Sequence, residues 1–311
     1  MALVVVHRGA SPYLRFALRQ ARHASPDSRV VLLGDAANAG FPAEHVDLGA
    51  APYDRATASF DAAYRHLSTN RERFERVCFQ RWFWIREWMR QSGEASAWVM
   101  DSDVMLYAAE AELAETWGPG LALQRPLAQD GYRWCTTAGI AHWTREALDD
   151  FCAFVLSGYE AGDLAERYAD KWAYHTSSGE PGGVCDMTAL HLFADTRDWT
   201  NLCAVRDGVT CDFNTASPEN LTEAEYAMDG PLKAVRWDAR DRPHARNLRL
   251  GREVRFQALH FAGQTKLAMA AAYRGPSFGG QRGAALRTGG YFRLRRAGAR
   301  LLGPVVRRLR G

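Results

Sequence analysis

Asp101, Ser102 and Asp103 form the single D-x-D triplet of this 311-residue protein. Short apolar runs flank the triplet at 97–100 and 104–107, and such runs predict buried strands. The two carboxylates are therefore expected where a strand leaves its sheet. Paired carboxylates can hold a hard divalent cation through oxygen ligands, and the cation can bridge two phosphates. The triplet alone is weak evidence, because a solvated turn with two acids has the same sequence.

A second group of reactive side chains, His260, Gly263 and Lys266, follows an apolar run late in the sequence. A histidine there can supply a nitrogen ligand to Mn²⁺. The glycine lets a backbone N–H approach a phosphate, and the lysine can neutralise one as a point charge. A core histidine, a turn glycine and a surface lysine remain the competing interpretation. If both groups serve one site, Asp103 and His260 should face one another across a single cation.

The segments that must position these residues alternate between strand and helix patterns. Apolar runs at 3–6 and 29–33 are typical of strands, and 12–24 between them has helical spacing. This order predicts a parallel strand pair with a right-handed crossover. Further strands are expected at 45–48, 97–100, 121–123 and 137–142, and further helices at 64–90, 146–156 and 186–193.

The pattern as a whole predicts an α/β fold with a mixed, mainly parallel central sheet flanked by helices. Prolines interrupt the stretch 195–255, where we expect loops and short antiparallel strands. No linker divides the body, so the expected organisation is one domain over residues 1–270 and a basic tail over 271–311.

These features resemble the GT-A-fold glycosyltransferases, which have a Rossmann-like sheet, and most closely the glycogenin-like retaining sugar transferases. Members of that family have an N-terminal β-α-β nucleotide-binding half, then a D-x-D that follows a strand near the middle of the sequence, and a late H-x-x-G-x-x-K. All three occur here in that order, and the resemblance covers residues 3 to about 266.

The resemblance implies a role for each residue of the two motifs. Asp101 would contact the donor ribose and a metal ion, Asp103 would bind the metal with both carboxylate oxygens, and His260 would complete the metal site. Gly263 and Lys266 would contact the diphosphate. The implied cofactor is Mn²⁺ or Mg²⁺, and the implied donor is a nucleoside diphosphate sugar, with a UDP-sugar favoured.

Three further residues match the family more loosely. Arg81, on the helix before the D-x-D strand, would contact the donor, and Gly139 belongs to the strand under the transferred sugar. Asp186 follows a Gly-Gly pair and would meet the sugar hydroxyls, or deprotonate the acceptor in an inverting enzyme. Capping of a helix is the alternative role for Asp186.

Two departures from the family pattern leave the donor base and sugar open. The family often has Pro-Trp after its lysine, where this protein has Leu267 and Ala268. Its base-binding signature near the first strand is not legible in residues 7–10. Whether the configuration of the sugar is retained or inverted also stays open.

Charge is distributed unevenly along the sequence, whose net charge is +3. No Asp or Glu follows Glu253, whereas 12 Lys and Arg do, so the preceding residues carry a balance of −9. Apolar residues recur at three- and four-residue spacing within the arginine-rich end, as in an amphipathic segment. We expect residues 291–310 to meet an anionic membrane surface and not nucleic acid. A disordered basic tail is the alternative.

The remaining sequence features concern the compartment. The six cysteines include no C-x-x-C pair, so neither a zinc site nor a disulfide framework is expected. No secretory signal or 18-residue apolar stretch is present. These features favour a cytoplasmic protein, peripheral at the inner face of the membrane.

The function that these expectations favour is transfer of a hexose from a nucleoside diphosphate sugar to an acceptor hydroxyl. The acceptor would be a glycan or a lipid-linked sugar in cell-surface glycan or glycolipid synthesis. A non-catalytic nucleotide-sugar-binding module is one alternative. The other is a phosphohydrolase with Asp101 as nucleophile and Asp103 as general acid, which leaves residues 260–266 without a role.

Overall fold

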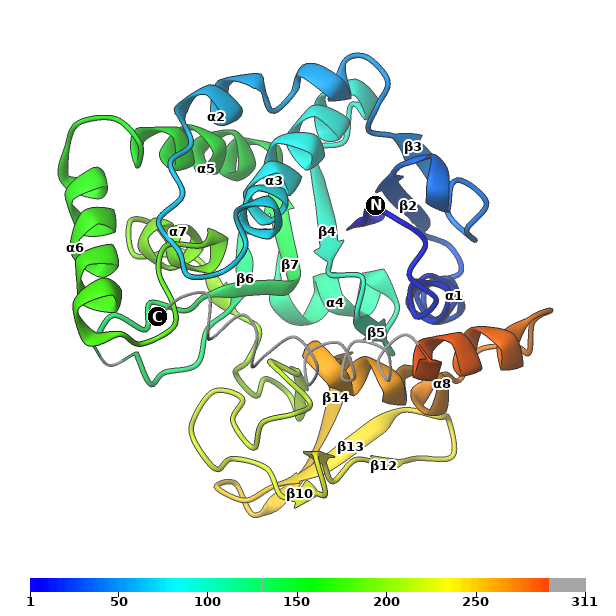
Figure 1. The fold of residues 1–311 in the computed structure, drawn as a ribbon. Helices are drawn as coiled ribbons and strands as arrows, with labels where there is room; N and C mark the ends of the chain where they lie inside the picture. Colours follow the sequence, from blue (N-terminus) through cyan, green and yellow to red (C-terminus); the bar gives the residue numbers. More distant parts are fainter. Residues whose placement is uncertain (130, 291–311) are drawn as a thin grey trace.

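The computed structural model describes residues 1–129 and 131–290, and Figure 1 shows their arrangement. Its centre is a seven-stranded sheet. In spatial order the strands are β3 (Glu44–Asp47), β2 (Arg29–Gly34), β1 (Ala2–Val6), β4 (Ser96–Met100), β7 (Thr137–Thr144), β6 (Ala122–Gln124) and β8 (Thr200–Asn201). Of its neighbouring pairs, β4–β7 and β6–β7 are antiparallel and the others are parallel. The expected α/β fold with a mainly parallel sheet is confirmed.

Helices cover both faces of this sheet because its inner strands are apolar on both sides. In β1, Ala2 and Val4 pack into one core cluster, and Leu3 and Val5 pack into another, as the two-residue period of a strand requires. The first cluster includes side chains of α3 (Glu72–Ser92), α5 (Arg145–Ser157) and α7 (Asp186–Ala194). The second includes side chains of α1 (Leu14–Ala24) and α4 (Glu110–Trp117).

A second sheet lies below the central one in Figure 1. Its strands are β12 (Arg236–Trp237), β13 (Pro243–Asn247), β14 (Arg252–His260) and β5 (Val104–Leu106), with β9 (Val209–Cys211) paired to β14. Strand β5 follows the D-x-D triplet directly and pairs antiparallel with β14, so that Val104 lies opposite His260. This register brings the two motifs together.

The long connection before the second sheet has the expected character. It contains only short strands, including the pair β10 (Met228–Asp229) and β11 (Leu232–Lys233). Most of the strands in 195–255 pair antiparallel. Strands β8 and β9 depart from the expectation, because β8 runs parallel to β6 and β9 runs parallel to β14.

Beyond β14 the backbone continues through η3 (Gly263–Ala268) and α8 (Met269–Ala272). Tyr273 and Ala284 are buried in a third core cluster with Phe16 of α1. The expected domain boundary at residue 270 stays a prediction. The amphipathic segment expected over 291–310 lies outside the described residues. Among the described residues, every helix is too short or too polar to cross a membrane.

Two helices differ from expectation. The helix predicted over 64–90 begins only at Glu72 of α3, after a short separate helix α2 (Ala58–Ala63). Between them the backbone of Ser68 bridges to Gly183, so a tertiary contact replaces helical hydrogen bonds. Helix α6 (Asp163–Ser178) was not predicted. Its only buried residues are Tyr168 and Lys171, which is too little for an apolar stripe.

Candidate metal and donor site

The D-x-D triplet forms a tight turn between the two sheets. The Asp101 N–H donates to the Gly139 carbonyl at 2.8 Å, which continues the β4–β7 ladder by one residue. The Val104 N–H donates to the Asp101 carbonyl at 3.0 Å and closes the turn. Asp101 is half-buried, and Asp103 is 9% exposed. Both carboxylates therefore lie at the carboxyl end of β4, where α/β sheets bind ligands.

The β5–β14 pairing places His260 against the triplet. The Phe261 N–H donates to the Asp103 carbonyl at 2.9 Å, and the Nε2 atom of His260 lies 3.6 Å from Oδ1 of Asp103. One ligand atom each from Asp101, Asp103 and His260 lies within 4.8 Å of the others. The structure thus brings together the three residues that the sequence assigned to a metal, although 157 residues separate Asp103 from His260.

The imidazole of His260 is fixed by the loop that follows β9. Its Nδ1 lies 2.9 Å from the Phe213 carbonyl oxygen, and its backbone N–H donates to Oδ2 of Asp212 at 3.2 Å. A carbonyl oxygen only accepts, so Nδ1 carries the proton, and in the neutral ring the lone pair is on Nε2. Nε2 faces Asp103, so it presents this lone pair once it has lost its proton. The orientation is the one a metal ligand needs.

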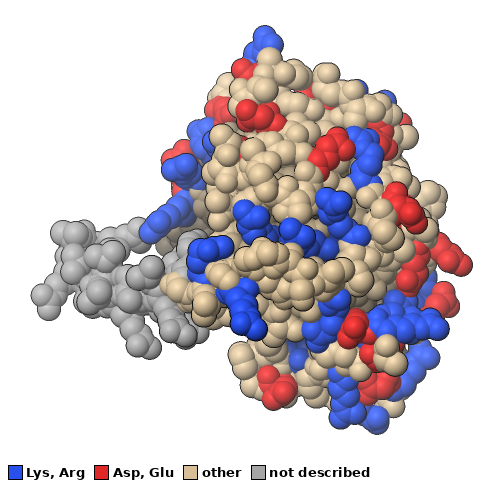
Figure 2. Space-filling model, turned by 90° about the vertical axis from the view of Figure 1, so that its right-hand side faces the viewer, with Lys and Arg blue, Asp and Glu red and all other residues tan. Residues whose placement is uncertain are grey.

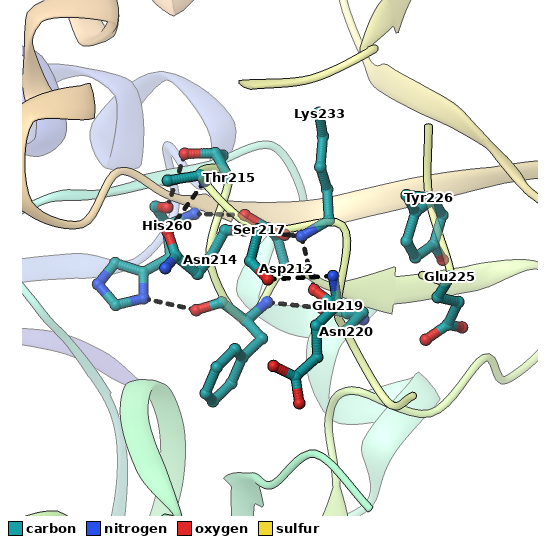
Figure 3. Close-up of polar contacts among 12 residues, drawn as sticks. Asp212, Asn214, Thr215, Ser217, Glu219, Asn220, Glu225, Tyr226, Lys233 and His260 are labelled. Carbon is teal, nitrogen blue, oxygen red and sulfur yellow. Dashed lines mark hydrogen bonds and ion pairs between the residues drawn. The ribbon is translucent and has the colours of Figure 1, made fainter. Parts of the chain in front are cut away.

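A buried ion pair holds this loop in place (Figure 3). The ammonium of Lys233 donates to Oδ1 of Asp212 at 2.6 Å, and both side chains are fully buried. Lys233 also donates to the carbonyl oxygens of Asn214 at 2.7 Å and Glu219 at 2.9 Å. Three acceptors on the loop thus converge on one cation, which fixes the loop that presents the Phe213 carbonyl to His260.

Two cations flank the carboxylates of the triplet. Lys266 Nζ lies 2.6 Å from Oδ2 of Asp103, and the Arg81 guanidinium donates to Asp101. Lys266 lies in η3, whose first residue, Gly263, has a positive φ of 58°. The two motifs therefore meet as the resemblance implied, with Lys266 beside the acidic pair.

These charges set the protonation of the cluster. Burial alone would raise the pKa of Asp103, but His260 and Lys266 outweigh it and lower that pKa below its usual range. Burial lowers the pKa of His260, whereas Asp103 outweighs burial and raises that pKa to about 9. Burial raises the pKa of Asp101 against the opposing effect of Arg81. Asp103 and His260 thus stabilise the charged forms of one another, whereas the charged form of Asp101 is disfavoured.

Arg81 joins the triplet to Asp186. Its Nη2 donates to Oδ2 of Asp186 at 2.6 Å while its Nη1 donates to Asp101, and the Trp82 indole N–H also donates to Asp186 at 3.3 Å. Asp186 is the first residue of α7 and is 4% exposed. Its carboxylate is directed to α3, so the helix-capping alternative does not describe it. The N-cap residue of α7 is Cys185, whose backbone N–H donates to the Thr188 hydroxyl at 3.4 Å.

Gly139 serves the site by lacking a side chain. A Cβ atom there would lie 2.9 Å from Oε1 of Gln124 and 3.0 Å from Nδ1 of His260. The glycine is buried on β7 beside the triplet, and its carbonyl binds Asp101. Its absent side chain leaves room for the imidazole.

Sequence reasoning missed His7, which lies at the carboxyl end of β1. Its Nδ1 is 3.0 Å from the Ser102 hydroxyl, and its ring meets the Tyr13 ring edge-on at 6.0 Å. Burial lowers the pKa of His7 to about 4, so the ring is neutral at pH 7. Its Nε2 is buried without a hydrogen-bond partner among the described residues. The one signal in the sequence was that His7 directly follows the first predicted strand, where α/β sheets bind ligands.

The ligand atoms that the cluster offers fit a divalent cation. Two carboxylates and an imidazole match the preferences of Mn²⁺ for mixed oxygen and nitrogen ligands better than those of Mg²⁺, which favours oxygen alone. The buried Nε2 of His7, at the same sheet edge, has no hydrogen-bond partner within residues 1–129 and 131–290 and is a polar atom of the kind that a bound ligand satisfies.

The protein is distantly similar to proteins of known structure. No protein-family model matches the sequence, and no curated protein matches it. Solved structures that it resembles include glycosyltransferases.

Three of these structures illustrate the level of similarity. The galactosyltransferase LgtC, with donor and acceptor sugar analogues, is 15% identical with a TM-score of 0.36 over 62% of this chain and 70% of that chain. Mouse xyloside xylosyltransferase 1 is 12% identical with a TM-score of 0.45 over 65% and 84%. The bifunctional glycosyltransferase WbbM is 13% identical with a TM-score of 0.48 over 92% and 51%. All three scores are below 0.5, so we base the proposals below on the geometry of the site.

Proposed function

We propose that this protein is a metal-dependent glycosyltransferase that moves a hexose from a nucleoside diphosphate sugar, with UDP favoured, to an acceptor hydroxyl. The observation that carries the proposal is the convergence of Asp101, Asp103 and His260 at the carboxyl end of β4. Lys266 and Arg81 flank this cluster as cations. Two carboxylates, an imidazole and adjacent cations are the groups needed to hold a cation with a diphosphate.

Each residue has a distinct role in this proposal. A bound Mn²⁺ would supply Lewis-acid stabilisation of the charge that develops on the leaving diphosphate. Lys266 would add a point charge on the same side, and the backbone at Gly263 would let the phosphates approach without a side chain in the way. Asp101 and Asp103 would hold the cation, and His260 would bind it through Nε2.

Arg81 and Asp186 orient the transferred sugar. Arg81 holds the Asp186 carboxylate beside the triplet, and the Trp82 indole N–H fixes the same oxygen. A buried carboxylate held in this way is suited to accept hydrogen bonds from sugar hydroxyls. The proposal therefore assigns Asp186 to the sugar and Arg81 to the alignment of both acids.

The acceptor side of the proposal includes an anionic membrane surface, where a glycan or lipid-linked acceptor would be located. Figure 2 shows the side of the molecule that carries α1, with Lys and Arg gathered across its middle. Neither α1 nor residues 269–290 contain Asp or Glu. Their basic side chains are Arg15, Arg19, Arg22, Arg274, Arg282 and Arg287. Full-length protein should float with vesicles that contain phosphatidylserine and not with pure phosphatidylcholine; equal behaviour contradicts the membrane proposal.

An assay of nucleoside diphosphate release tests the proposed activity. Wild-type protein should release the nucleoside diphosphate from a UDP- or GDP-hexose with Mn²⁺ and lose this activity with EDTA. Asp103→Ala should be inactive, whereas Asp47→Ala, which removes an exposed carboxylate on β3, should keep the wild-type rate. Turnover of a simple phosphate ester would instead indicate a phosphohydrolase. Donor binding without turnover would indicate a binding module.

A further inference from the structure

A cavity of ≈ 510 Å³ opens beside Asp186, outside the metal cluster. Cys185 and Met187, the sequence neighbours of Asp186, both line it. Its walls come from helix α6, the loop 131–135, the turn 180–183 and the segment before α3. The volume is that of a small-molecule site. Nothing in the proposed donor chemistry uses these walls.

One wall of the cavity carries a buried lysine that hydrogen-bonds to neutral groups. Lys171 is 4% exposed, and its Nζ donates to the Thr188 hydroxyl at 2.9 Å and to the Arg133 carbonyl at 3.2 Å. Among residues 1–129 and 131–290, no carboxylate lies within 4 Å of this ammonium. Two of its three N–H donors are therefore used, both by neutral acceptors. Within the described part of the chain this buried cation has no counter-ion, and a bound anion would compensate the cost of burying it.

The same face of α6 supplies aromatic and polar groups. Tyr174 and His175 follow Lys171 at three- and four-residue spacing and line the same cavity. The ring of Tyr132 lies 5.1 Å from that of Tyr174, with 38° between the planes. Ser68 and Asn70 bring a hydroxyl and an amide from the opposite wall. Aromatic faces beside hydroxyl and amide groups are suited to a ring with one apolar face and several hydroxyls.

We propose that this cavity binds the acceptor, and that the acceptor is a saccharide carrying an anionic group, a carboxylate or a phosphate, that pairs with Lys171. The proposal rests on the proposed function, since it treats the ligand as acceptor of the transferred sugar. Asp186 links the two sites because it contacts Arg81 on the donor side and its sequence neighbours line the cavity.

The charge of Glu180, which also lines the cavity, indicates which end the anion occupies. Glu180 is exposed, and Oε2 of its carboxylate accepts a hydrogen bond from the Tyr174 hydroxyl at 3.2 Å. Its charge lies at the mouth, whereas Lys171 is buried. An anionic group is therefore repelled at the mouth and attracted at the buried end, and the sugar ring lies between them against Tyr174.

Binding of three small sugars by calorimetry or saturation-transfer NMR tests the proposal. The probes are methyl β-glucuronoside, glucose 6-phosphate and the neutral methyl β-glucoside. Wild-type protein should bind at least one anionic sugar about tenfold more tightly than the neutral one, as expected for one charge-assisted hydrogen bond. The two anionic probes separate carboxylate from phosphate recognition. Equal affinity for all three overturns the proposal.

Three variants of α6 make the test specific. Lys171→Met should abolish the preference for the anionic sugar, whereas Arg167→Met should keep it. Arg167 is exposed one helical turn earlier and is not part of the cavity wall, so its removal controls for net charge. An unchanged preference in Lys171→Met contradicts the proposal. Tyr174→Ala should weaken the binding of all three sugars, because it removes the aromatic ring against which the sugar ring lies. Unchanged affinities would contradict that contact.

Nucleoside diphosphate binding separates this proposal from the proposed function. UDP with Mn²⁺ should raise the melting temperature of the wild type and of all three variants equally, which also shows that they fold. If the wild type binds UDP but does not prefer the anionic sugars, the cavity proposal is refuted and the proposed function is not. Anionic-sugar binding that depends on Lys171 without any nucleotide binding or turnover refutes the proposed function alone.

Discussion

At the scale of single residues, the site depends on a side chain that is absent. Gly139 leaves the space into which Nδ1 of His260 fits, because a Cβ atom would come within 3.0 Å of it. A contact of 3.0 Å is tighter than nearly all Cβ contacts, and the same Cβ atom would lie 2.9 Å from Oε1 of Gln124, so Gln124 must move and His260 must shift slightly. The position of His260 is thus set from one side by β7 and from the other by the Phe213 carbonyl.

The Gly139→Ala variant tests this steric requirement. We expect the affinity for Mn²⁺ to fall by about tenfold, in line with the effect of disturbing groups that orient a metal ligand. Gly40→Ala is the matched control because a Cβ atom there meets nothing within 4 Å. Titration of Mn²⁺ by electron paramagnetic resonance measures both. Equal affinities in the two variants would show that His260 has no such constraint.

Arg81 is the second residue on which several others depend. It is 15% exposed and pairs with both Asp101 and Asp186. Arg81→Met leaves two shielded carboxylates without their cation, which should lower the free energy of unfolding by about 3 kcal/mol. Arg90, also on α3, forms an exposed pair with Asp149 of α5, and Arg90→Met should cost less than about 1 kcal/mol. Urea unfolding measures the free energy of unfolding of both variants. Similar decreases in the two variants would contradict a structural role for the Arg81 bridge.

At the scale of elements, the loop between β9 and β11 fixes the orientation of His260 in the metal cluster. Lys233 and Asp212 neutralise one another in full burial, and the loop they hold carries the carbonyl that orients His260. A buried pair is most damaging to stability when only one member is lost. Its contribution can therefore be separated from general packing by a double-mutant cycle.

We predict that Lys233→Met destabilises the fold by about 3–5 kcal/mol, because it leaves the Asp212 charge buried and unpaired. The double variant Asp212→Asn with Lys233→Met should recover part of this loss, since no buried charge remains at this pair. Urea unfolding of both single variants and the double variant gives the coupling free energy. Strict additivity of the two single effects would contradict the buried-pair interpretation.

The elements also show how far local sequence patterns determine the fold. The β1-α1-β2 unit and the strand before Asp101 were predictable, because their apolar runs and helical spacing are local properties. The segment 64–71 was not, since its conformation depends on a bridge to Gly183 more than a hundred residues away. Helix α6 was missed because its buried face contains a lysine in place of an apolar residue.

At the scale of the whole molecule, the antiparallel pairing of β5 with β14 joins two halves of the protein at one site. Family resemblance could predict that Asp103 and His260 share a site, but the register that achieves this is tertiary information. The burial of Lys171, Asp212 and Lys233 was likewise not predictable, since a sequence does not show which polar residues the fold will enclose. The support of the site and the adjacent cavity were therefore visible only in the structure.

Direct measurement of Mn²⁺ binding, with and without UDP, tests the central claim most directly. Electron paramagnetic resonance should show one Mn²⁺ per protein molecule in the wild type, bound more tightly when UDP is present. Asp103→Asn and His260→Ala should each lose this site while remaining folded by circular dichroism. Wild-type protein that binds no Mn²⁺ with UDP, or both variants binding it as tightly as the wild type, would contradict the account.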